Sequence, residues 1–158
     1  MITKASSAQR TLERETRRLA AQKVRYVNDD LIANLLLIPG IPLDGAELET
    51  ELLVRLTRQT VGDRRFYVVR SWMLFDVMLS DSQLTHLERD GGCATILYAS
   101  ELAYDSNTGG ALPGAIRTGY QRSFSDFYFE TNSAVFVLAG PGSRKHASVP
   151  ALVALDAA

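Results

Sequence analysis

The stretch of residues 115–140 constrains the fold of this chain more than any other part of the sequence. Apolar and polar residues alternate along it, the alternation stops at residues 131–133, and an apolar run follows at residues 135–138. Alternation with a period of two residues, bounded by turn-forming residues, is typical of a half-buried strand that folds back on its neighbour. The sequence therefore predicts an antiparallel pair of strands that closes a sheet towards the C-terminus.

The N-terminal part of the chain has the pattern of helices instead. Apolar residues between positions 7 and 37 recur three, four and seven residues apart, which places them on one stripe of a helix. The polar run 28–30 could divide this helix in two. Asp44 and Glu47 have the spacing of a capping box, which predicts the start of a further helix that ends near Gly62.

The rest of the chain reads as strands with one short helix between them. Residues 66–75 and 95–104 are rich in aromatic and β-branched residues, which predicts two strands. Residues 80–90 begin with a serine and a glutamine at capping spacing and predict a short helix. Helices followed by strands favour the α+β class. We therefore expect an N-terminal helical segment, residues 1–62, packed on or beside a mainly antiparallel β-sheet domain, residues 63–158.

Charge and composition narrow the classes of function. The formal net charge is −1, so the chain as a whole gives no electrostatic argument for nucleic acid or an anionic membrane. Apolar runs such as residues 35–38 are far too short to cross a bilayer, and we expect a cytoplasmic protein. The lone Cys93 and two histidines, His86 and His146, are too few for a zinc site. We expect no metal and no cofactor, and we expect Cys93 to be a small buried residue.

A set of charged and polar residues at strands or strand ends forms the first candidate site. Its members are Arg70, Asp76, Asp105, Arg117, Thr118 and Glu130. An arginine beside carboxylates near a loop can grip a phosphate or a charged side chain of a partner bidentately. Opposite charges on neighbouring strands also pair with each other on a solvated sheet face, which is the alternative. We predict that five of these residues bind a partner: Arg70, Asp105, Arg117, Thr118 and Glu130.

No recognised catalytic constellation accompanies this set. Arg117, Ser123 and Glu130 occur in the order arginine, serine, glutamate, which resembles the order in ADP-ribosyl-transfer sites. Their spacing is much too tight for three separate strands, so we expect no catalytic residues. The glycine- and cation-containing segment 140–146 predicts a surface turn, or a flexible cationic loop that contacts phosphates.

The second candidate site lies in the N-terminal helix, which is locally basic. Four arginines within two to three turns can share one broad face: Arg10, Arg14, Arg17 and Arg18. Contacts from such a face to phosphates would give salt-sensitive, sequence-independent binding of nucleic acid. A solvated helix, with Glu13 and Glu15 among the arginines, is the alternative.

The apolar stripe of the same helix needs a cover. It includes Leu12, Leu19, Val27 and Leu31. If the next helix cannot cover the whole stripe, a second copy of the chain can, because a two-fold pair of identical faces closes on itself. We therefore expect a homodimer.

The later part of the chain resembles a small uncharacterised bacterial domain that is common in prophages and genomic islands. The resemblance covers roughly residues 66–155 and depends on the order and spacing of short motifs. These are Val69-Arg70-Ser71-Trp72, Phe75-Asp76-Val77, Leu97-Tyr98-Ala99, Tyr104-Asp105-Ser106, Gly114, Arg117-Thr118, Phe124, Phe129-Glu130-Thr131, residues 135–140, Gly142 and Arg144.

That family has no established activity, so the resemblance implies a context and no mechanism. The context is an accessory protein of a phage or another mobile element, a group that includes inhibitors of host defence. We therefore expect a non-enzymatic protein-binding module, with nucleic-acid binding through the basic helix as the alternative.

Overall fold

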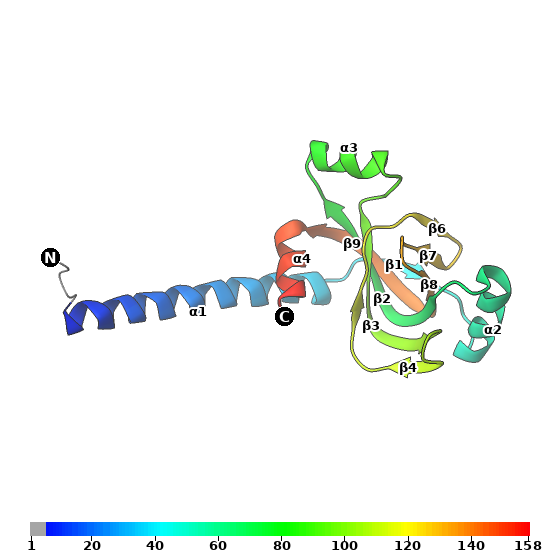
Figure 1. Cartoon of the computed structure of the whole chain (residues 1–158), viewed down its shortest axis with the longest axis horizontal. Coiled ribbons are helices and arrows are strands. Elements are labelled where there is room, and N and C mark those ends of the chain that lie inside the picture. Colours follow the sequence, from blue (N-terminus) through cyan, green and yellow to red (C-terminus); the bar gives the residue numbers. More distant parts are fainter. Residues whose placement is uncertain (1–5) are drawn as a thin grey trace. The chain divides into compact units, whose positions relative to one another are not determined.

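The computed structural model describes residues 6–158, with four helices and nine strands among them (Figure 1). In chain order these are α1 (Ser7–Leu37), β1 (Ile41–Asp44), α2 (Thr50–Val61), β2 (Phe66–Met78), α3 (Asp81–Arg89), β3 (Thr95–Asp105), β4 (Gly110–Leu112), β5 (Ile116–Arg117), β6 (Ser123–Ser125), β7 (Tyr128–Glu130), β8 (Val135–Leu138), β9 (Pro141–Ser148) and α4 (Val149–Asp156). The α+β class is confirmed.

The chain divides into two compact units, which we describe separately. One unit comprises α1 and the C-terminal residues Pro150–Ala158, and the other comprises Pro39–Val149. The expected division at residue 62 differs from this one, because α2 belongs to the unit that contains the sheet. Residues 1–5 of the expected helical region lie outside the described residues.

Helix α1 forms a single continuous element. Its N-cap is Ser6, whose hydroxyl accepts from the Gln9 backbone N–H while the Gln9 side chain accepts from the Ser6 backbone N–H. The helix passes through the polar run 28–30 without a break and ends at Leu37, two residues before Pro39. None of the described helices is both long and apolar enough to span a lipid bilayer.

The predicted helix start at Asp44 is wrong. Asp44 ends strand β1, which pairs with β9, and the next backbone groups bond to β8 and to Gly140. The Gly45 N–H donates to the Gly140 carbonyl at 2.9 Å, and the Ala46 N–H donates to the Leu138 carbonyl at 2.8 Å. The Ala46 carbonyl in turn accepts from the Gly140 N–H at 3.0 Å, so the backbone of these residues is paired with the segment that joins β8 to β9, and α2 begins only at Thr50.

The sheet is mixed, and β2 lies at its centre. Strand β3 pairs antiparallel with β2 along one edge. Along the other edge β2 pairs in parallel, first with β8 and then with β9. The predicted antiparallel pair at the end of the sequence is present as β7 and β8, which were expected to close the sheet. The segment 140–146, predicted as a loop or turn, instead lies largely in strand β9.

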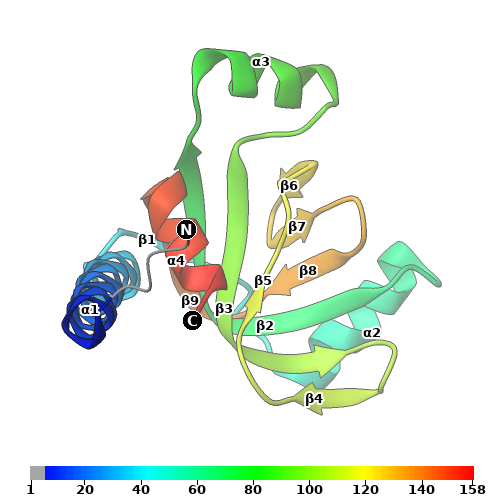
Figure 2. The same ribbon diagram turned by 60° about the vertical axis from the view of Figure 1, so that its left-hand side comes forward.

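The sheet curls into a ring that is completed by the chain segment from β5 to β6, and Figure 2 shows this part from a second direction. Strand β3 pairs with β5, and the chain continues from β5 along β3 through a Thr118 N–H to Leu97 carbonyl bond of 2.9 Å. The chain then enters β6, which pairs with β7; β7 pairs with β8 and β8 returns to β2. The enclosed side of the ring holds the main apolar core.

Both the first and the second half of β2 contribute side chains to this core. This is possible because the alternation of its side chains between the two faces of the sheet shifts by one residue at Ser71. Ser71 has a φ of 50°, and the residues before and after it contact the same core cluster: Val69, Trp72 and Leu74. The pairing of β2 with β3 keeps one register across Ser71, so the left-handed conformation changes the side to which later side chains point without adding a residue to the pairing. Trp72 is 2% exposed, and its Nε1–H donates to the Gly140 carbonyl at 3.2 Å.

The opposite face of the sheet packs against α2. Leu53 of α2 is fully buried and joins a cluster with Phe66, Val68, Val135 and Val137. Alternate residues of β2 and β8 therefore supply two cores, one on each side of the sheet.

The other sequence predictions have mixed outcomes. Helix α3 is present, with the capping box between Ser80 and Gln83 that its sequence predicts. The C-terminal helix α4 was not predicted. Cys93 is exposed, so its expected burial is wrong. It follows Gly92 at a bend beyond α3, and only its backbone is held, by a bridge to Gln121.

Candidate functional site

A cavity of about 250 Å³ lies where the start of β2, the end of β5 and the β7–β8 turn come together. Its polar lining consists of Arg65, Tyr67, Arg117, Thr118, Thr131 and Ser133. Ile116, Ala134 and Phe136 add apolar surface. We call it the Arg65–Arg117 cavity.

One wall of the cavity is a stack of flat groups. The Tyr67 and Phe136 rings lie parallel with centroids 5.0 Å apart, and the Arg65 guanidinium carbon lies 4.9 Å from the Tyr67 centroid. Arg65 Nη2 also donates to Asp105 Oδ2 at 3.2 Å. Burial raises the pKa of Tyr67 above its ordinary value of 10.0, and the protonated hydroxyl can donate a hydrogen bond.

Hydrogen bonds hold the backbone of the remaining walls in place. The Thr118 hydroxyl accepts from the Leu97 N–H at 3.0 Å and donates to the Gly119 carbonyl at 2.8 Å. Thr131 Oγ1 accepts from the N–H groups of Ser133 and Ala134 at 3.3 Å. Two guanidinium groups beside hydroxyls in a pre-arranged pocket suit a carboxylate or phosphate group.

The structure brings only part of the predicted partner-binding set into this cavity. Arg117 and Thr118 line it, and the buried Asp105 adjoins it through Arg65. Arg70 donates to the Leu48 carbonyl at 3.1 Å and to Thr50 Oγ1 at 3.2 Å, which ties the start of α2 to β2. Glu130 lies elsewhere, in an ion pair of 3.1 Å with Arg64.

The residues considered for ADP-ribosyl transfer are not gathered around one cavity. Ser123 donates to Glu130 Oε2 at 2.7 Å across the β6–β7 pair. The other carboxylate oxygen of Glu130 accepts from Arg64. Arg117 lines the Arg65–Arg117 cavity, and Glu130 is not among the residues that line that cavity.

Asp76, the sixth residue of the polar set, forms a bidentate ion pair across neighbouring strands, as the alternative for this set predicted, but its partner Arg144 was not predicted. Arg144 of β9 donates to both carboxylate oxygens of Asp76 at 2.7 Å, and Thr95 Oγ1 of β3 donates at 2.8 Å. These contacts join three neighbouring strands. Hydrogen bonds from Arg144 are the main reason that the pKa of Asp76 lies below its ordinary value of 3.8.

We predict that this ion pair makes the stability of the fold sensitive to acid. A carboxyl group with a lowered pKa stabilises the folded state above its unfolded pKa, and this contribution is lost as the pH falls through the lower folded pKa. Asp76→Asn should therefore lower the free energy of unfolding by about 1–2 kcal/mol at neutral pH. In urea titrations, the difference from the unmodified protein should shrink as the pH falls below about 4.

Asp63→Asn is the control for that experiment, because Asp63 is exposed. It should change the free energy of unfolding by less than about 0.5 kcal/mol. A difference at Asp76 that stays constant down to about pH 2 would contradict the role given to its ionised carboxylate.

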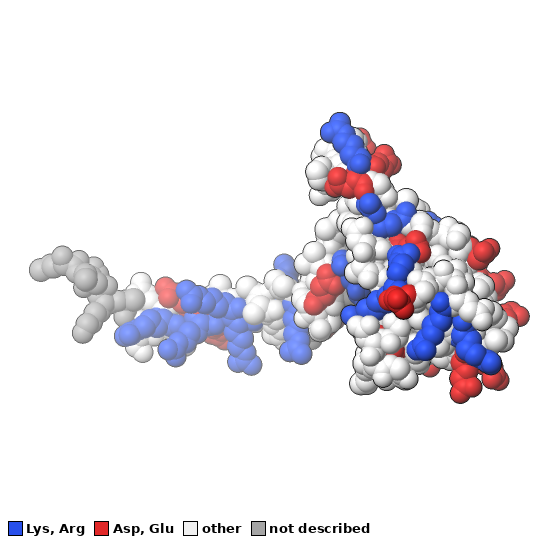
Figure 3. Space-filling model, turned by 45° about the vertical axis from the view of Figure 1, so that its right-hand side comes forward, with Lys and Arg blue, Asp and Glu red and all other residues white. Residues whose placement is uncertain are grey.

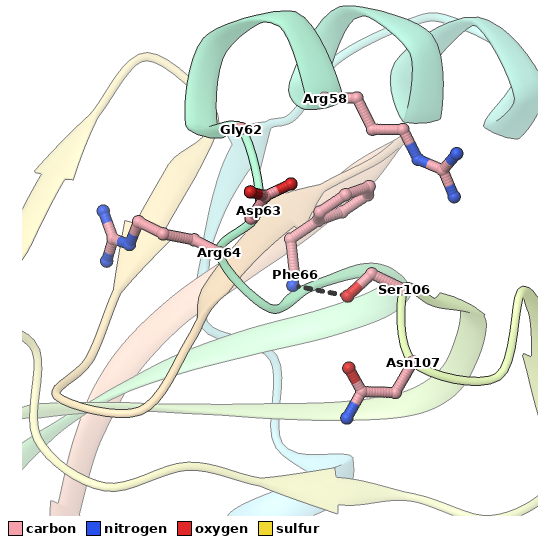
Figure 4. Close-up of a pocket in the computed structure, with 7 residues that line it drawn as sticks. All are labelled: Arg58, Gly62, Asp63, Arg64, Phe66, Ser106 and Asn107. Carbon is pink, nitrogen blue, oxygen red and sulfur yellow. Dashed lines mark hydrogen bonds between the residues drawn. The ribbon is translucent and has the colours of Figure 1, made fainter.

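A second cavity, of about 370 Å³, lies between the end of α2 and the loop after β3 (Figure 4). Arg58 and Arg64 line it, but in Figure 4 their side chains extend in opposite directions. Arg58 donates to the Tyr104 hydroxyl, and Arg64 pairs with Glu130. Ser106 Oγ accepts from the Phe66 N–H at 2.9 Å. The cations therefore do not converge on one point in this cavity.

Within residues 6–158, no group of three or more His, Cys, Asp or Glu side chains is placed to hold a metal ion. His86 lies on α3, with its Nε2 3.8 Å from Asp90 Oδ2, and both side chains are largely exposed.

The arginines of the second candidate site all lie on the exposed part of α1. Arg10, Arg14, Arg17 and Arg18 are exposed. Figure 3 shows Lys and Arg side chains gathered along this helix, with few Asp or Glu side chains among them.

Several residues of the Arg65–Arg117 cavity were missed by sequence reasoning. Arg65, Tyr67, Thr131 and Ser133 line the cavity but are not in the predicted partner-binding set. Their sequence signal is a set of polar residues at strand ends, which is common. The ring closure is what brings them to Arg117.

The fold of the sheet unit defines its class: an α+β domain built on a curled mixed sheet, with one helix on the outer face. Residues 44–154 match the model of the family described as "Domain of unknown function (DUF6957)". The chain therefore belongs to the DUF6957 family. The match begins before α2, earlier than the resemblance seen in the sequence, and leaves α1 outside. No curated protein and no solved structure matches the chain.

Proposed function

We propose that this protein is a non-enzymatic protein-binding module, and that an acidic group of its partner enters the Arg65–Arg117 cavity. The observation that carries the proposal is the lining of this cavity by two arginines and several hydroxyls. Asp105 offsets one of the two cations through its 3.2 Å contact with Arg65. A carboxylate that enters would meet the two guanidinium groups, and such groups form charge-assisted hydrogen bonds with carboxylates.

The size of the cavity favours a protein side chain over a free metabolite. Pockets for drug-sized ligands occupy roughly 300–1,000 Å³. At about 250 Å³, the Arg65–Arg117 cavity suits a single Asp or Glu side chain or a chain terminus. Most of the binding area would then come from the surrounding surface, as it does in protein–protein interfaces with one charged anchor.

The setting that we propose is a bacterial cell that carries a phage or another mobile element. There the protein would act in the cytoplasm and inhibit a host defence complex, as a homodimer joined along α1. The motif resemblance described above supports the mobile-element setting. The exposed leucines and valines along α1 support self-association, because a second copy would remove them from water.

We test the binding role by capture from a lysate of the native host at physiological salt. The unmodified protein is compared with Arg117→Gln, and Arg55→Gln is the matched control because Arg55 is exposed on α2, away from the cavity. We expect Arg117→Gln to lower recovery of the partner at least about fivefold, since it removes a charge-assisted hydrogen-bond donor. Arg55→Gln should leave recovery unchanged.

The controls separate two failures. If the unmodified protein recovers no partner, the protein-binding role is contradicted. If Arg117→Gln and Arg55→Gln both retain the partner fully, the cavity is not the contact site. Thermal unfolding of Arg117→Gln shows whether any loss of recovery reflects loss of fold.

A further inference from the structure

The first turns of helix α1 carry four arginines on one side. At 3.6 residues per turn, the positions of Arg10, Arg14, Arg17 and Arg18 fall within an arc of about 100°. Glu13 and Glu15 lie outside this arc, one on each side of it, on the same helical count. The four arginines are exposed, and we call them the arginine face.

The apolar residues of this part of the helix lie on the opposite side. Leu12 and Leu19 are 67% and 61% exposed, and on the helical count they centre roughly 160° from the arginine face. The cavity between α1 and α4 is lined on the α1 side by residues from Ala21 to Ile32. The arginine face therefore lies on the part of α1 before that cavity.

We propose that the arginine face binds the phosphate backbone of nucleic acid without sequence preference. Arg10 and Arg18 are about 12 Å apart along the helix axis, at about 1.5 Å per residue. Duplex DNA carries one negative charge per roughly 1.7 Å, so several phosphates lie within reach of the four guanidinium groups. Guanidinium groups match phosphate geometry bidentately.

The arrangement of the two faces argues against an anionic membrane as the ligand. A helix that lies on a bilayer buries its apolar face among the lipids, and its cations flank that face so that they reach the headgroups. On α1 the arginines lie on the side opposite to the apolar residues. If the apolar side were buried in a bilayer, the arginines would face the water and not the lipid headgroups. A nucleic acid that binds the arginine side contacts the cations directly. The apolar side then stays available for another contact.

This inference goes beyond the protein-binding role, because α1 lies outside the family match and outside the sheet unit. The two can fail independently. A loss of nucleic-acid binding by substitutions in α1 should leave capture of a protein partner through the Arg65–Arg117 cavity unchanged.

The test is fluorescence anisotropy with the full chain and three probes of arbitrary sequence: duplex DNA, single-stranded DNA and single-stranded RNA. We expect binding to at least one probe in 50 mM salt, with log K falling against log salt with a slope of about −3 to −4 for three to four phosphate contacts. The triple variant Arg14→Glu, Arg17→Glu, Arg18→Glu should lose binding at least about a hundredfold.

The matched single variants are Arg14→Glu and Lys23→Glu. Both substitutions replace an exposed cation of α1 with a glutamate, so they change the net charge equally. They differ in place, because Lys23 lies on the apolar side of the helix. We expect Arg14→Glu to weaken binding several-fold and to reduce the salt slope by about 1, and Lys23→Glu to leave both nearly unchanged. Circular dichroism confirms that each variant keeps its helix.

Three results would overturn the proposal. The first is no binding of any probe in 50 mM salt. The second is an equal loss in Arg14→Glu and Lys23→Glu, which would mean a response to net charge alone. The third is binding to vesicles of phosphatidylserine and phosphatidylcholine by a protein that binds none of the nucleic-acid probes.

Discussion

Replacing Trp72 with alanine is expected to lower the free energy of unfolding by about 3–5 kcal/mol. Trp72 is almost fully buried within the ring of strands, where it shares a cluster with Val69, Leu74 and Phe129. Alanine would leave a large cavity, and the Gly140 carbonyl would lose the Nε1–H donor at 3.2 Å. Urea unfolding followed by far-ultraviolet circular dichroism measures the change, since the substitution removes the only tryptophan fluorophore.

Two further variants serve as comparisons for the loss of stability in Trp72→Ala. Trp72→Phe keeps much of the apolar volume but removes the donor, so it should cost less than the alanine variant. Tyr120→Ala removes an aromatic side chain that is 37% exposed, and it should cost less than about 1.5 kcal/mol. If Trp72→Ala lowers the free energy of unfolding no more than Tyr120→Ala does, the strands are not packed around the indole.

Replacing Gly142 with alanine is the second large effect that we expect, a loss of about 2–3 kcal/mol. A Cβ atom at Gly142 would lie 2.3 Å, 2.4 Å and 2.5 Å from three atoms of the Trp72 indole. Gly142 and Trp72 are register partners on the parallel strands β9 and β2, so the backbone cannot move away without breaking that pairing. The same urea titration measures the loss.

Gly110→Ala is the control for Gly142→Ala, because a Cβ atom at position 110 meets no atom within 4 Å and Gly110 has no positive φ. Its stability should stay within about 1 kcal/mol of the unmodified protein. The double variant Trp72→Ala, Gly142→Ala should cost clearly less than the sum of the two single losses, since the new Cβ then enters space that the indole has left. Strict additivity would contradict the direct contact.

The two proposed binding surfaces belong to different units of the chain. The Arg65–Arg117 cavity lies in the sheet unit, within the part that matches the DUF6957 family. The arginine face lies on α1, outside that match. If both proposals hold, the sheet unit recognises a protein and α1 adds salt-sensitive attachment to nucleic acid.

Local patterns were sufficient to predict much of the secondary structure. The alternation in residues 115–140 predicted the β7–β8 pair, and the serine–glutamine spacing predicted the cap of α3. These signals depend on residues a few positions apart, whose geometry is set within the element itself. The helix predicted at Asp44 failed because the same residues pair with β9, about a hundred positions later in the chain.

The candidate site likewise combines residues that local patterns identified with residues that they did not. Arg117 and Thr118 were selected from the sequence as polar residues at a strand end, and both line the cavity. Arg65, Tyr67 and Ser133 were not selected, and the segment that holds Arg144 was predicted as a loop although Arg144 pairs with Asp76. No local pattern encodes these partnerships, because each joins residues whose distance in sequence exceeds any helical or strand period.

The amino-acid sequence by itself determined the α+β class, the long basic helix and most of the strands, since periodicity and capping act over a few residues. Only the tertiary structure decided the parallel pairing of β2 with β8 and β9, the closure of the ring and the composition of the cavity. Those features depend on which distant strands share backbone hydrogen bonds and which side chains then fill the enclosed space.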